Sequence, residues 1–377
     1  MLLSISQGDW EFNIKLRQRA ITIGMDEKLI SRKKPTFPIN EELYKYLSMY
    51  NRSIKIPIFY DDLLRFSGSV TVYDKNDKDT LWIRVYYPEF EQQEIDMSLK
   101  RMYNILHGDG SEGILENLII DEIDYCTFGN SKPFRVKVRN ILNDNYTYIY
   151  VKKADASRVY GLELEHILSP NHINFLIYKD TLIEEHVLGI PGDMFMEESL
   201  ASISKVEQQR LSKEFVKFNE RCTLRLLGDM RAYNYVVIPT YDFDQVQFRI
   251  RAMDFDQQSF EGKLKVYRPQ FFKDNYPFVK MVEKNLGNES VDQYKKEERS
   301  ALAKRLKSSH NRIRRLLKCM KNDHISTPEN IENLKKELVD YTHDKNFKEC
   351  NTMGDIIQVV FDFVVRNYES ANTYIIR

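Results

Sequence analysis

The sequence contains few cysteines and none of the short motifs that mark common metal sites. Its four cysteines are far apart and form no C-x-x-C pair, which argues against a zinc site and against a secreted disulfide framework. We therefore expect reduced thiols at Cys126, Cys222, Cys319 and Cys350. The seven histidines show no H-E-x-x-H or similar spacing, so a histidine metal site is not expected. A P-loop motif, G-x-x-x-x-G-K followed by Ser or Thr, is also missing.

The sequence also lacks a long apolar run and an excess of charge of either sign. No stretch approaches the roughly 18 uninterrupted apolar residues of a membrane-spanning helix, and the chain starts with only a short apolar run. The 56 basic and 56 acidic side chains cancel, so no global field attracts nucleic acid or an anionic membrane. We expect a soluble, cytoplasmic protein without a membrane partner. Its 377 residues, 42% hydrophobic and 12% aromatic, suffice for two or three domains.

Changes in hydrophobic period divide the chain into three parts, because no internal repeat is present. Residues 1–114 are expected to form an N-terminal α+β domain of unknown role, which ends in a glycine-containing linker at 108–113. The expected elements of this domain are a helix at 42–50, strands at 54–60, 68–74 and 80–87, and a helix at 92–108.

The second part, residues 115–192, is rich in strands. Alternating and β-branched runs predict three strands, a helix and two further strands, in that order. These elements are expected at 118–128, 133–142, 146–153, 157–168, 173–179 and 182–188.

The third part, residues 193–377, is mainly helical and contains one β-hairpin. Apolar residues recur at intervals of three and four along each predicted helix. The helices are expected at 204–227, 277–286, 291–321, 328–342 and 353–370, and the hairpin strands at 235–238 and 246–255.

Three polar residues around this hairpin form a pattern that suits phosphoryl transfer. Asp229 lies five residues before Asn234, and Asp254 ends the second hairpin strand. Phosphoryl transfer needs one carboxylate to orient the acceptor hydroxyl and further oxygen ligands to hold Mg²⁺ against the phosphates. Magnesium prefers carboxylate and amide oxygens, together with water and phosphate. We therefore expect Asp229 to act as the base and Asn234 and Asp254 to act as metal ligands.

The segment from Leu227 to Asp256 resembles the catalytic loop and metal-binding motif of the aminoglycoside phosphotransferase and choline kinase branch of the protein kinase-like superfamily. The conserved motif positions of that branch are matched here by Gly228, Asp229, Asn234 and Asp254. The resemblance implies an α+β, bilobal protein-kinase-like fold, in which 115–192 is a β-rich small lobe and 193–377 a helical large lobe. It also implies ATP and Mg²⁺ as cofactors.

Two positions depart from the family pattern. Leu227 replaces the customary His that braces the loop, so the loop geometry must be maintained by other packing. Asp256 stands where protein kinases carry a Gly, and it either adds a metal oxygen or caps the segment that follows. The site therefore resembles that of small-molecule and atypical kinases.

The resemblance further implies a phosphate-binding lysine on the third strand of the small lobe and an acid on the next helix. Lys152 or Lys153 would bind the α- and β-phosphates, and Glu163 would hold the lysine in an ion pair. Lys152 is favoured because it shares a strand face with Tyr148 and Tyr150. The alternative is a solvated lysine pair at a strand end and an exposed helix acid.

The remaining expected contacts to ATP come from backbone groups. The turn that contains Gly129 and Ser131 lies where a phosphate-covering loop belongs, although it lacks a G-x-G-x-x-G pattern and is also typical of a simple hairpin turn. Backbone groups from Glu185 to Val187 are expected to bind adenine.

An ATP- and Mg²⁺-dependent kinase that acts on a protein or a small hydroxylated molecule is the preferred interpretation. A pseudokinase that binds nucleotide or a protein partner is the first alternative, and an enzyme that transfers AMP on the same scaffold is the second. Asp229 and Asn234 are also common as loop residues without a catalytic role.

A basic run extends from Lys304 to Lys321 and contains no acid. It could receive an acidic or phosphorylated partner. The alternative is a solvated helix face that packs through its leucines. Nucleic acid is not expected, because no aromatic residue is interleaved with these charges.

Overall fold

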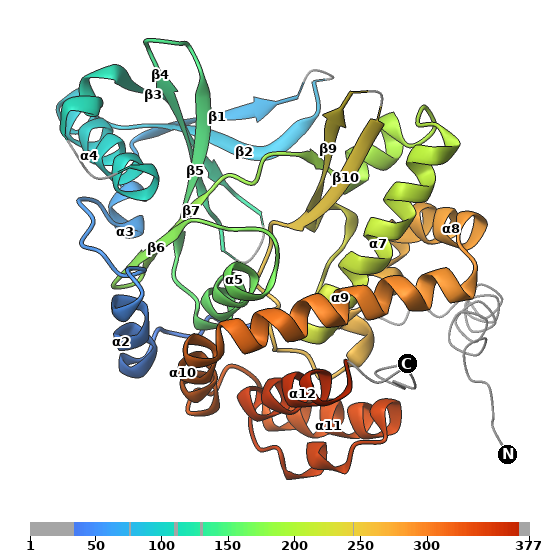
Figure 1. The fold of residues 1–377 in the computed structure, drawn as a ribbon. Helices are drawn as coiled ribbons and strands as arrows, with labels where there is room; N and C mark the ends of the chain where they lie inside the picture. Colours follow the sequence, from blue (N-terminus) through green and yellow to red (C-terminus); the bar gives the residue numbers. More distant parts are fainter. Residues whose placement is uncertain (1–33, 75–76, 109–111, 129–130, 244, 369–377) are drawn as a thin grey trace, which may run out of the picture. The chain divides into compact units, whose positions relative to one another are not determined.

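The computed structural model describes residues 34–74, 77–108, 112–128, 131–243 and 245–368, which form two compact units (Figure 1). The first, here called the sheet unit, comprises residues 34–166 and 170–187. The second, the helical unit, comprises residues 167–169 and the described residues from 188 onwards. The expected α+β class is confirmed.

The sheet unit is built on an antiparallel sheet with the strand order β1-β2-β3-β4-β5-β7-β6. Its strands are β1 (Gly68–Tyr73), β2 (Asp79–Tyr86), β3 (Leu118–Cys126), β4 (Phe134–Asn140), β5 (Tyr146–Lys153), β6 (Phe175–Tyr178) and β7 (Thr181–Glu185). Its helices are α2 (Glu41–Met49), α3 (Tyr60–Leu63), α4 (Glu89–His107) and α5 (Ala156–Leu168), with a short 3₁₀ turn at Glu112–Asn117.

One face of this sheet carries the core of the unit. In strand β4, buried and basic residues alternate. The buried residues are Phe134, Val136 and Val138, and the basic residues between them point to the opposite face. Helix α4 packs on the apolar face over β3 and β4. Full burial of a side chain such as Phe134 contributes about 1.5–3 kcal/mol. The alternation therefore leaves the second face polar.

The sheet unit differs from the expected domain division at residue 114. Strand β2 pairs with β3 through Trp82–Cys126, Ile83–Tyr125 and Arg84–Asp124, so the first hairpin extends the same sheet. Leu99 and Met102 of α4 share a core with Phe134 and Val136. Residues 34–108 and 112–187 therefore belong largely to one unit.

The strand expected at 54–60 is wrong, because this segment is irregular before α3 and contains Pro57, which cannot donate to a strand ladder.

The helical unit contains the second hairpin and most of the helices. Its strands are β8 (Ile190–Pro191), β9 (Tyr235–Asp242) and β10 (Gln245–Ala252), in the order β10-β9-β8. Its helices are α6 (Gly192–Met194), α7 (Lys205–Arg225), α8 (Tyr276–Asn285), α9 (Asn288–Ser308), α10 (His310–Lys321), α11 (Pro328–Thr342) and α12 (Met353–Asn367). Short helical turns lie at Phe195–Ser199, Ala232–Asn234, Leu264–Tyr267, Pro269–Phe271, Lys273–Asn275 and Lys345–Glu349.

Helix α7 positions the loop that contains Asp229. It begins with a capping box, in which Ser204 accepts from the amide of Glu207 and Glu207 accepts from the amide of Ser204. Its buried side packs against β10, α8 and α9. It ends at Leu226, whose left-handed conformation (φ 51°) turns the chain out of the helix. The predicted helix and hairpin on either side of the loop are confirmed.

The long helix expected at 291–321 is wrong in one respect, because it breaks at Ser309 into α9 and α10. The break allows α9 to pack against α7 while α10 packs mainly against α12. Sequence periodicity alone does not reveal the break, since both halves are amphipathic. Among the helices described, none is long and apolar enough to cross a membrane.

Candidate functional site

The loop after α7 is held by backbone contacts with residues 257–266. Leu227 forms an antiparallel bridge with Gln258. The amide of Gly228 donates to the carbonyl of Gln257 at 3.1 Å, and the amide of Asp229 donates to that of Val266 at 3.2 Å. The side chain of Leu227 is buried. Main-chain bonds and apolar packing thus brace the loop without the His that the family pattern would supply.

A glycine is required at position 228, because atoms of Gln257 and Val266 lie where a side chain would begin. A Cβ at this position would lie 2.9 Å from the carbonyl oxygen of Gln257 and 3.0 Å from a methyl group of Val266. Gly228→Ala should therefore lower the free energy of unfolding by about 1–3 kcal/mol, the usual cost of overpacking. Urea denaturation measures this. Gly68→Ala is the matched control, because a Cβ there meets nothing within 4 Å. Equal losses in both variants would refute the explanation.

Hydrogen bonds bring Asp229, Asn234 and Asp254 together. The Asn234 side-chain Nδ2 donates to the carbonyl of Asp229 at 2.7 Å. The Asn234 carbonyl accepts from the amides of Met253 at 3.0 Å and Asp254 at 3.3 Å. The pairing of Tyr235 with Ala252 closes the base of the hairpin next to these bonds. The two ends of the hairpin therefore hold the three predicted residues in one cluster.

The carboxyl group of Asp229 is perturbed by its surroundings. Its pKa is raised to about 7, mainly by burial and also by the nearby Asp254 and Glu261, while Arg231 opposes the rise. The Arg231 Nε donates to Asp229 Oδ1 at 3.1 Å. Asp229 also has a left-handed backbone (φ 57°), a strained conformation of the kind often found at functional sites. Such a carboxyl group is poised to exchange a proton near neutral pH.

Two further residues of this cluster, Arg231 and Glu261, were not predicted from the sequence. Arg231 pairs with Asp229 and also, through Nη1, with Asp274 at 3.2 Å. Glu261 is buried, and burial raises its pKa. The sequence did contain a signal for Arg231, because a basic residue two positions after Asp229 lies close enough to pair with it. Nothing local pointed to Glu261, because the chain must fold back to bring it near Asp229.

The oxygen atoms of the cluster suit magnesium chemically. Because Asn234 uses its amide nitrogen on the Asp229 carbonyl, its amide oxygen is the atom that can face a cation. Asp254 Oδ1 accepts from the amide of Asp256 at 3.1 Å, so Asp256 follows Asp254 in a tight turn, with its side chain largely buried. The described residues contain no group of three or more His, Cys, Asp or Glu side chains arranged to hold a metal. Magnesium is commonly held by one or two carboxylates plus water and phosphate, which fits this donor set.

In the sheet unit, Lys152 has a different partner from the one expected. Its Nζ donates to Glu184 Oε2 at 2.8 Å, and Arg158 also donates to both oxygens of Glu184. All three side chains are buried. Burial alone would raise the pKa of Glu184, but Arg158 and Lys152 lower it to about 2. Glu184 is therefore a carboxylate shared by two cations.

The predicted ion pair between Lys152 and Glu163 is wrong. Glu163 is fully buried and accepts from the Tyr46 hydroxyl at 2.7 Å and from Arg52 Nε at 3.0 Å. Helix α5 therefore directs this acid toward α2 and the segment that follows it. The register of β5 and β7 instead places Glu184 opposite Tyr150, on the same sheet face as Lys152.

The two adjacent lysines differ clearly in environment. The side chain of Lys152 is 8% exposed, whereas that of Lys153 is 52% exposed. Lys153 lies 4.0 Å from Asp61 and 3.9 Å from Asp180, distances typical of loose surface pairs. Of the two candidates, Lys152 is the one held in a fixed position.

The expected backbone contacts to ATP have a mixed outcome. Gly129 lies outside the described residues. Ser131 is half-buried in the β3–β4 turn. The amide of Glu185 already donates to the carbonyl of Asn174 at 3.0 Å, so it is not available to adenine. Val187 is buried at the end of the sheet unit.

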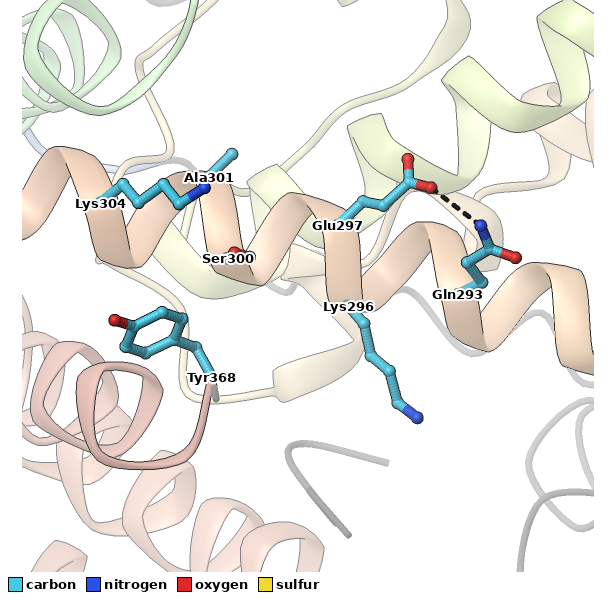
Figure 2. Close-up of a pocket in the computed structure, with 7 residues that line it drawn as sticks. All are labelled: Gln293, Lys296, Glu297, Ser300, Ala301, Lys304 and Tyr368. Carbon is cyan, nitrogen blue, oxygen red and sulfur yellow. Dashed lines mark hydrogen bonds between the residues drawn. The ribbon is translucent and has the colours of Figure 1, made fainter. Parts of the chain in front are cut away.

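A shallow cavity of about 500 Å³ runs along α9 (Figure 2). It is lined by Gln293, Lys296, Glu297, Ser300, Ala301, Lys304 and Tyr368. Gln293 donates to Glu297 across its wall at 3.2 Å. None of the candidate catalytic residues lines it, so the cavity does not mark the site predicted from sequence. Lys304 is the one residue it shares with the basic run from Lys304 to Lys321.

No protein-family model matches the sequence, and no curated protein matches it either.

Proposed function

We propose that this protein is an ATP- and Mg²⁺-dependent phosphotransferase of the protein kinase-like type, acting on a hydroxyl group of a protein or a small molecule. The observation that carries the proposal is the hydrogen-bonded cluster of Asp229, Asn234 and Asp254. One residue able to take a proton thereby lies beside oxygen donors that suit a magnesium ion.

Each residue has a separate task in this proposal. Asp229 accepts the proton of the acceptor hydroxyl and orients that hydroxyl for attack. Arg231, anchored also on Asp274, holds the Asp229 carboxyl in place. Asn234 and Asp254 hold the magnesium ion, and Asp256 supplies a further carboxylate next to them. When bound, magnesium neutralises the charge that develops on the phosphates.

The sheet unit supports the proposal through its order of elements. Strands β3, β4 and β5 are followed by α5, and β7 then pairs with β5 and with β6 at the edge. This is the order of elements that the resemblance to kinases implies. Lys152 on β5 is buried and carries a fixed charge partner, as expected of a lysine that binds phosphate. Its partner is Glu184 instead of an acid on α5.

A pseudokinase is the second candidate, and the ion pairs of Lys152 favour it. Lys152 and Arg158 already share Glu184, so a phosphate must compete with a buried carboxylate for this lysine. A protein that no longer turns over ATP could retain this closed arrangement for structural reasons.

Transfer from labelled ATP tests the proposal. The wild type is incubated with Mg²⁺, cell lysate and ATP labelled at the γ- or the α-phosphate. Asp254→Asn should lower γ-transfer by at least about 10²-fold, because magnesium stabilises the transition state by several kcal/mol. Asp242→Asn, an exposed position in the same hairpin, is the control.

Three results would contradict the proposal. Transfer of the α-label would indicate AMP transfer. Mg²⁺-dependent ATP binding without turnover would indicate a pseudokinase. Equal activity in Asp254→Asn and the wild type would remove the assigned site.

A further inference from the structure

The outer strand of the sheet unit, β1, has one unpaired edge. It stands at the end of the strand order and forms a ladder only with β2, from the pair Gly68–Tyr86 to the pair Val72–Trp82 (Figure 1). Every second residue of such a strand directs its N–H and C=O groups away from the sheet. In the part of the chain that the structure describes, no group outside β2 forms a hydrogen bond with a residue of β1. The outer backbone groups of β1 are therefore available to another strand.

The opposite edge of the same sheet is covered by the chain itself. The Ile177 amide of β6 donates to the Arg52 carbonyl at 2.8 Å, and Ser53 forms a parallel bridge with Ile177. In the smaller sheet, the edge strand β8 is two residues long and contains Pro191. Covering, shortening and proline are common ways in which proteins protect sheet edges from other chains.

The second edge of the smaller sheet, β10, is covered by side chains of α7. Arg210 Nη1 donates to the Val246 carbonyl at 3.1 Å. Glu214 Oε1 accepts from the Ile250 amide at 3.2 Å, and Arg221 Nη2 donates to the Ile250 carbonyl at 3.3 Å. Among the described strands, β1 is thus the long sheet edge that the chain leaves unprotected.

The sequence of β1, GSVTVY, has none of the residues that oppose strand pairing. It contains no charged side chain and no proline, and β-branched residues occupy its middle. Val70 is 58% exposed and Tyr73 is 59% exposed. The ladder with β2 is regular as far as Val72, after which the register shifts. Residues 68–72 are therefore suited to accept a further strand.

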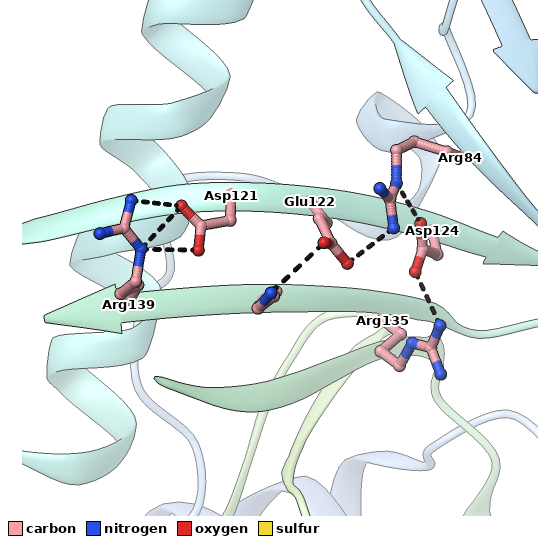
Figure 3. A network of polar contacts seen from close by, with 7 residues as sticks. Arg84, Asp121, Glu122, Asp124, Arg135 and Arg139 are labelled. Atoms are coloured by element: carbon pink, nitrogen blue, oxygen red, sulfur yellow. Dashed lines mark hydrogen bonds and ion pairs between the residues drawn. The ribbon is translucent and has the colours of Figure 1, made fainter. Parts of the chain in front are cut away.

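The charged residues of the neighbouring strands are already paired with one another (Figure 3). Arg84 of β2 donates to Glu122 at 2.6 Å and to Asp124 at 2.9 Å, and Arg135 donates to Asp124 at 2.8 Å. The other members of this network are Lys137, Arg139, Asp121 and Asp144. Four basic side chains thus pair with four acidic ones, and none of these contacts reaches β1. This balanced network favours an uncharged strand as the partner of β1.

We propose that β1 pairs antiparallel with β1 of a second copy of this chain, so that the two sheets join across a two-fold axis. An antiparallel pair of identical strands is self-complementary, because each copy offers the same alternation of donors and acceptors. No like charges oppose each other in this pair, since the strand has none. Assembly stops at the dimer, because the opposite edge of each sheet is covered.

Sedimentation velocity of the full chain over a range of concentrations tests this pairing. The wild type should shift from the monomer mass to twice that mass as its concentration rises. Val70→Lys should weaken the dimer at least about 10-fold, because it places a charge on each of the two facing edges. Val206→Lys is the matched control, because Val206 is 55% exposed but lies on α7 in the helical unit. It should dimerise as the wild type does.

Hydrogen exchange gives a second measurement that needs no variant. The outward-facing amides of residues 68–72 should exchange more slowly as the wild-type concentration rises, because a partner strand protects them. The amides of β10 should not respond to concentration, because side chains of α7 already cover that edge. This measurement decides the matter if Val70→Lys does not fold.

Several results would overturn the proposed dimer. A wild type that remains monomeric, or β1 amides whose exchange is independent of concentration, would leave the edge to a strand of a different protein. Folded Val70→Lys that dimerises like the wild type would place the interface elsewhere, and species that grow beyond a dimer would refute the closed pairing. None of these results bears on phosphoryl transfer, because Asp229, Asn234 and Asp254 lie in the helical unit.

Discussion

Asp229→Asn should abolish most phosphoryl transfer and, in Mg²⁺-free buffer at pH 8, make the protein more stable than the wild type. Loss of a general base lowers the rate by about 10²–10⁴-fold. The stability change has the opposite sign because burial raises the pKa of Asp229 to about 7. Above that pH the folded protein must hold a buried carboxylate that the unfolded chain hydrates freely, and Asn removes this cost.

The pH dependence of the effect follows from the direction of the pKa shift. Since the folded state binds the Asp229 proton more tightly, wild-type stability decreases as the pH rises from about 4 to about 7. The gain from Asn should therefore be largest above pH 7 and disappear near pH 4. Thermal unfolding between pH 4 and pH 8 measures it.

Asp340→Asn, an exposed acid on α11, is the control and should show no such trend. An Asp229→Asn variant that keeps its activity, or that melts below the wild type at pH 8, would contradict the prediction. Arg231 keeps its second partner, Asp274, in this variant, so the loop should not lose its anchor.

Glu184→Gln should be among the most destabilising single substitutions in the sheet unit. It would remove the buried carboxylate that the side chains of Lys152 and Arg158 both contact. Removal of one partner from a buried ion pair typically costs about 3–5 kcal/mol. In the wild type, the pKa of Glu184 is about 2, below its ordinary value of 4.5, because of these two cations. The stabilisation is therefore complete above pH 4.5 and is lost as the pH falls toward 2.

Urea denaturation at pH 7 measures this loss. Glu185→Gln, at the next position of β7, is the matched control, because Glu185 is only partly buried and points to the other side of the strand. Equal stability of the Glu184→Gln and Glu185→Gln variants would show that Glu184 is not the shared counter-charge. Nucleotide titrations of Glu184→Gln and Glu163→Gln then compare the observed partner of Lys152 with the one expected from sequence.

Several features of the fold follow from sequence patterns that act over short distances. The alternation of Phe134, Val136 and Val138 with basic residues predicts a strand with one buried face. Ser204 and Glu207 mark the beginning of α7. The spacing of Asp229 and Asn234, between a helix and a hairpin, predicts their proximity, because the loop that joins them is short. Each of these features depends on neighbours within a few residues along the chain.

The partner of Lys152 depended on the tertiary structure. Glu163 and Glu184 are both acids downstream of Lys152, and helical spacing favours the first. The register between β5 and β7 and the rotation of α5 decide between them, and both are set by packing against distant residues. The same holds for the pairing of β2 with β3, which joins the N-terminal hairpin to the sheet.

Most of the helices and strands, and the loop that carries Asp229, Asn234 and Asp254, can be predicted from the sequence, because hydrophobic period, capping and loop length are local. The perturbed environment of Asp229 and the Glu184 carboxylate shared by Lys152 and Arg158 become visible in the tertiary structure. Burial and ion pairing depend on which distant segments approach one another, and a local pattern does not contain that information.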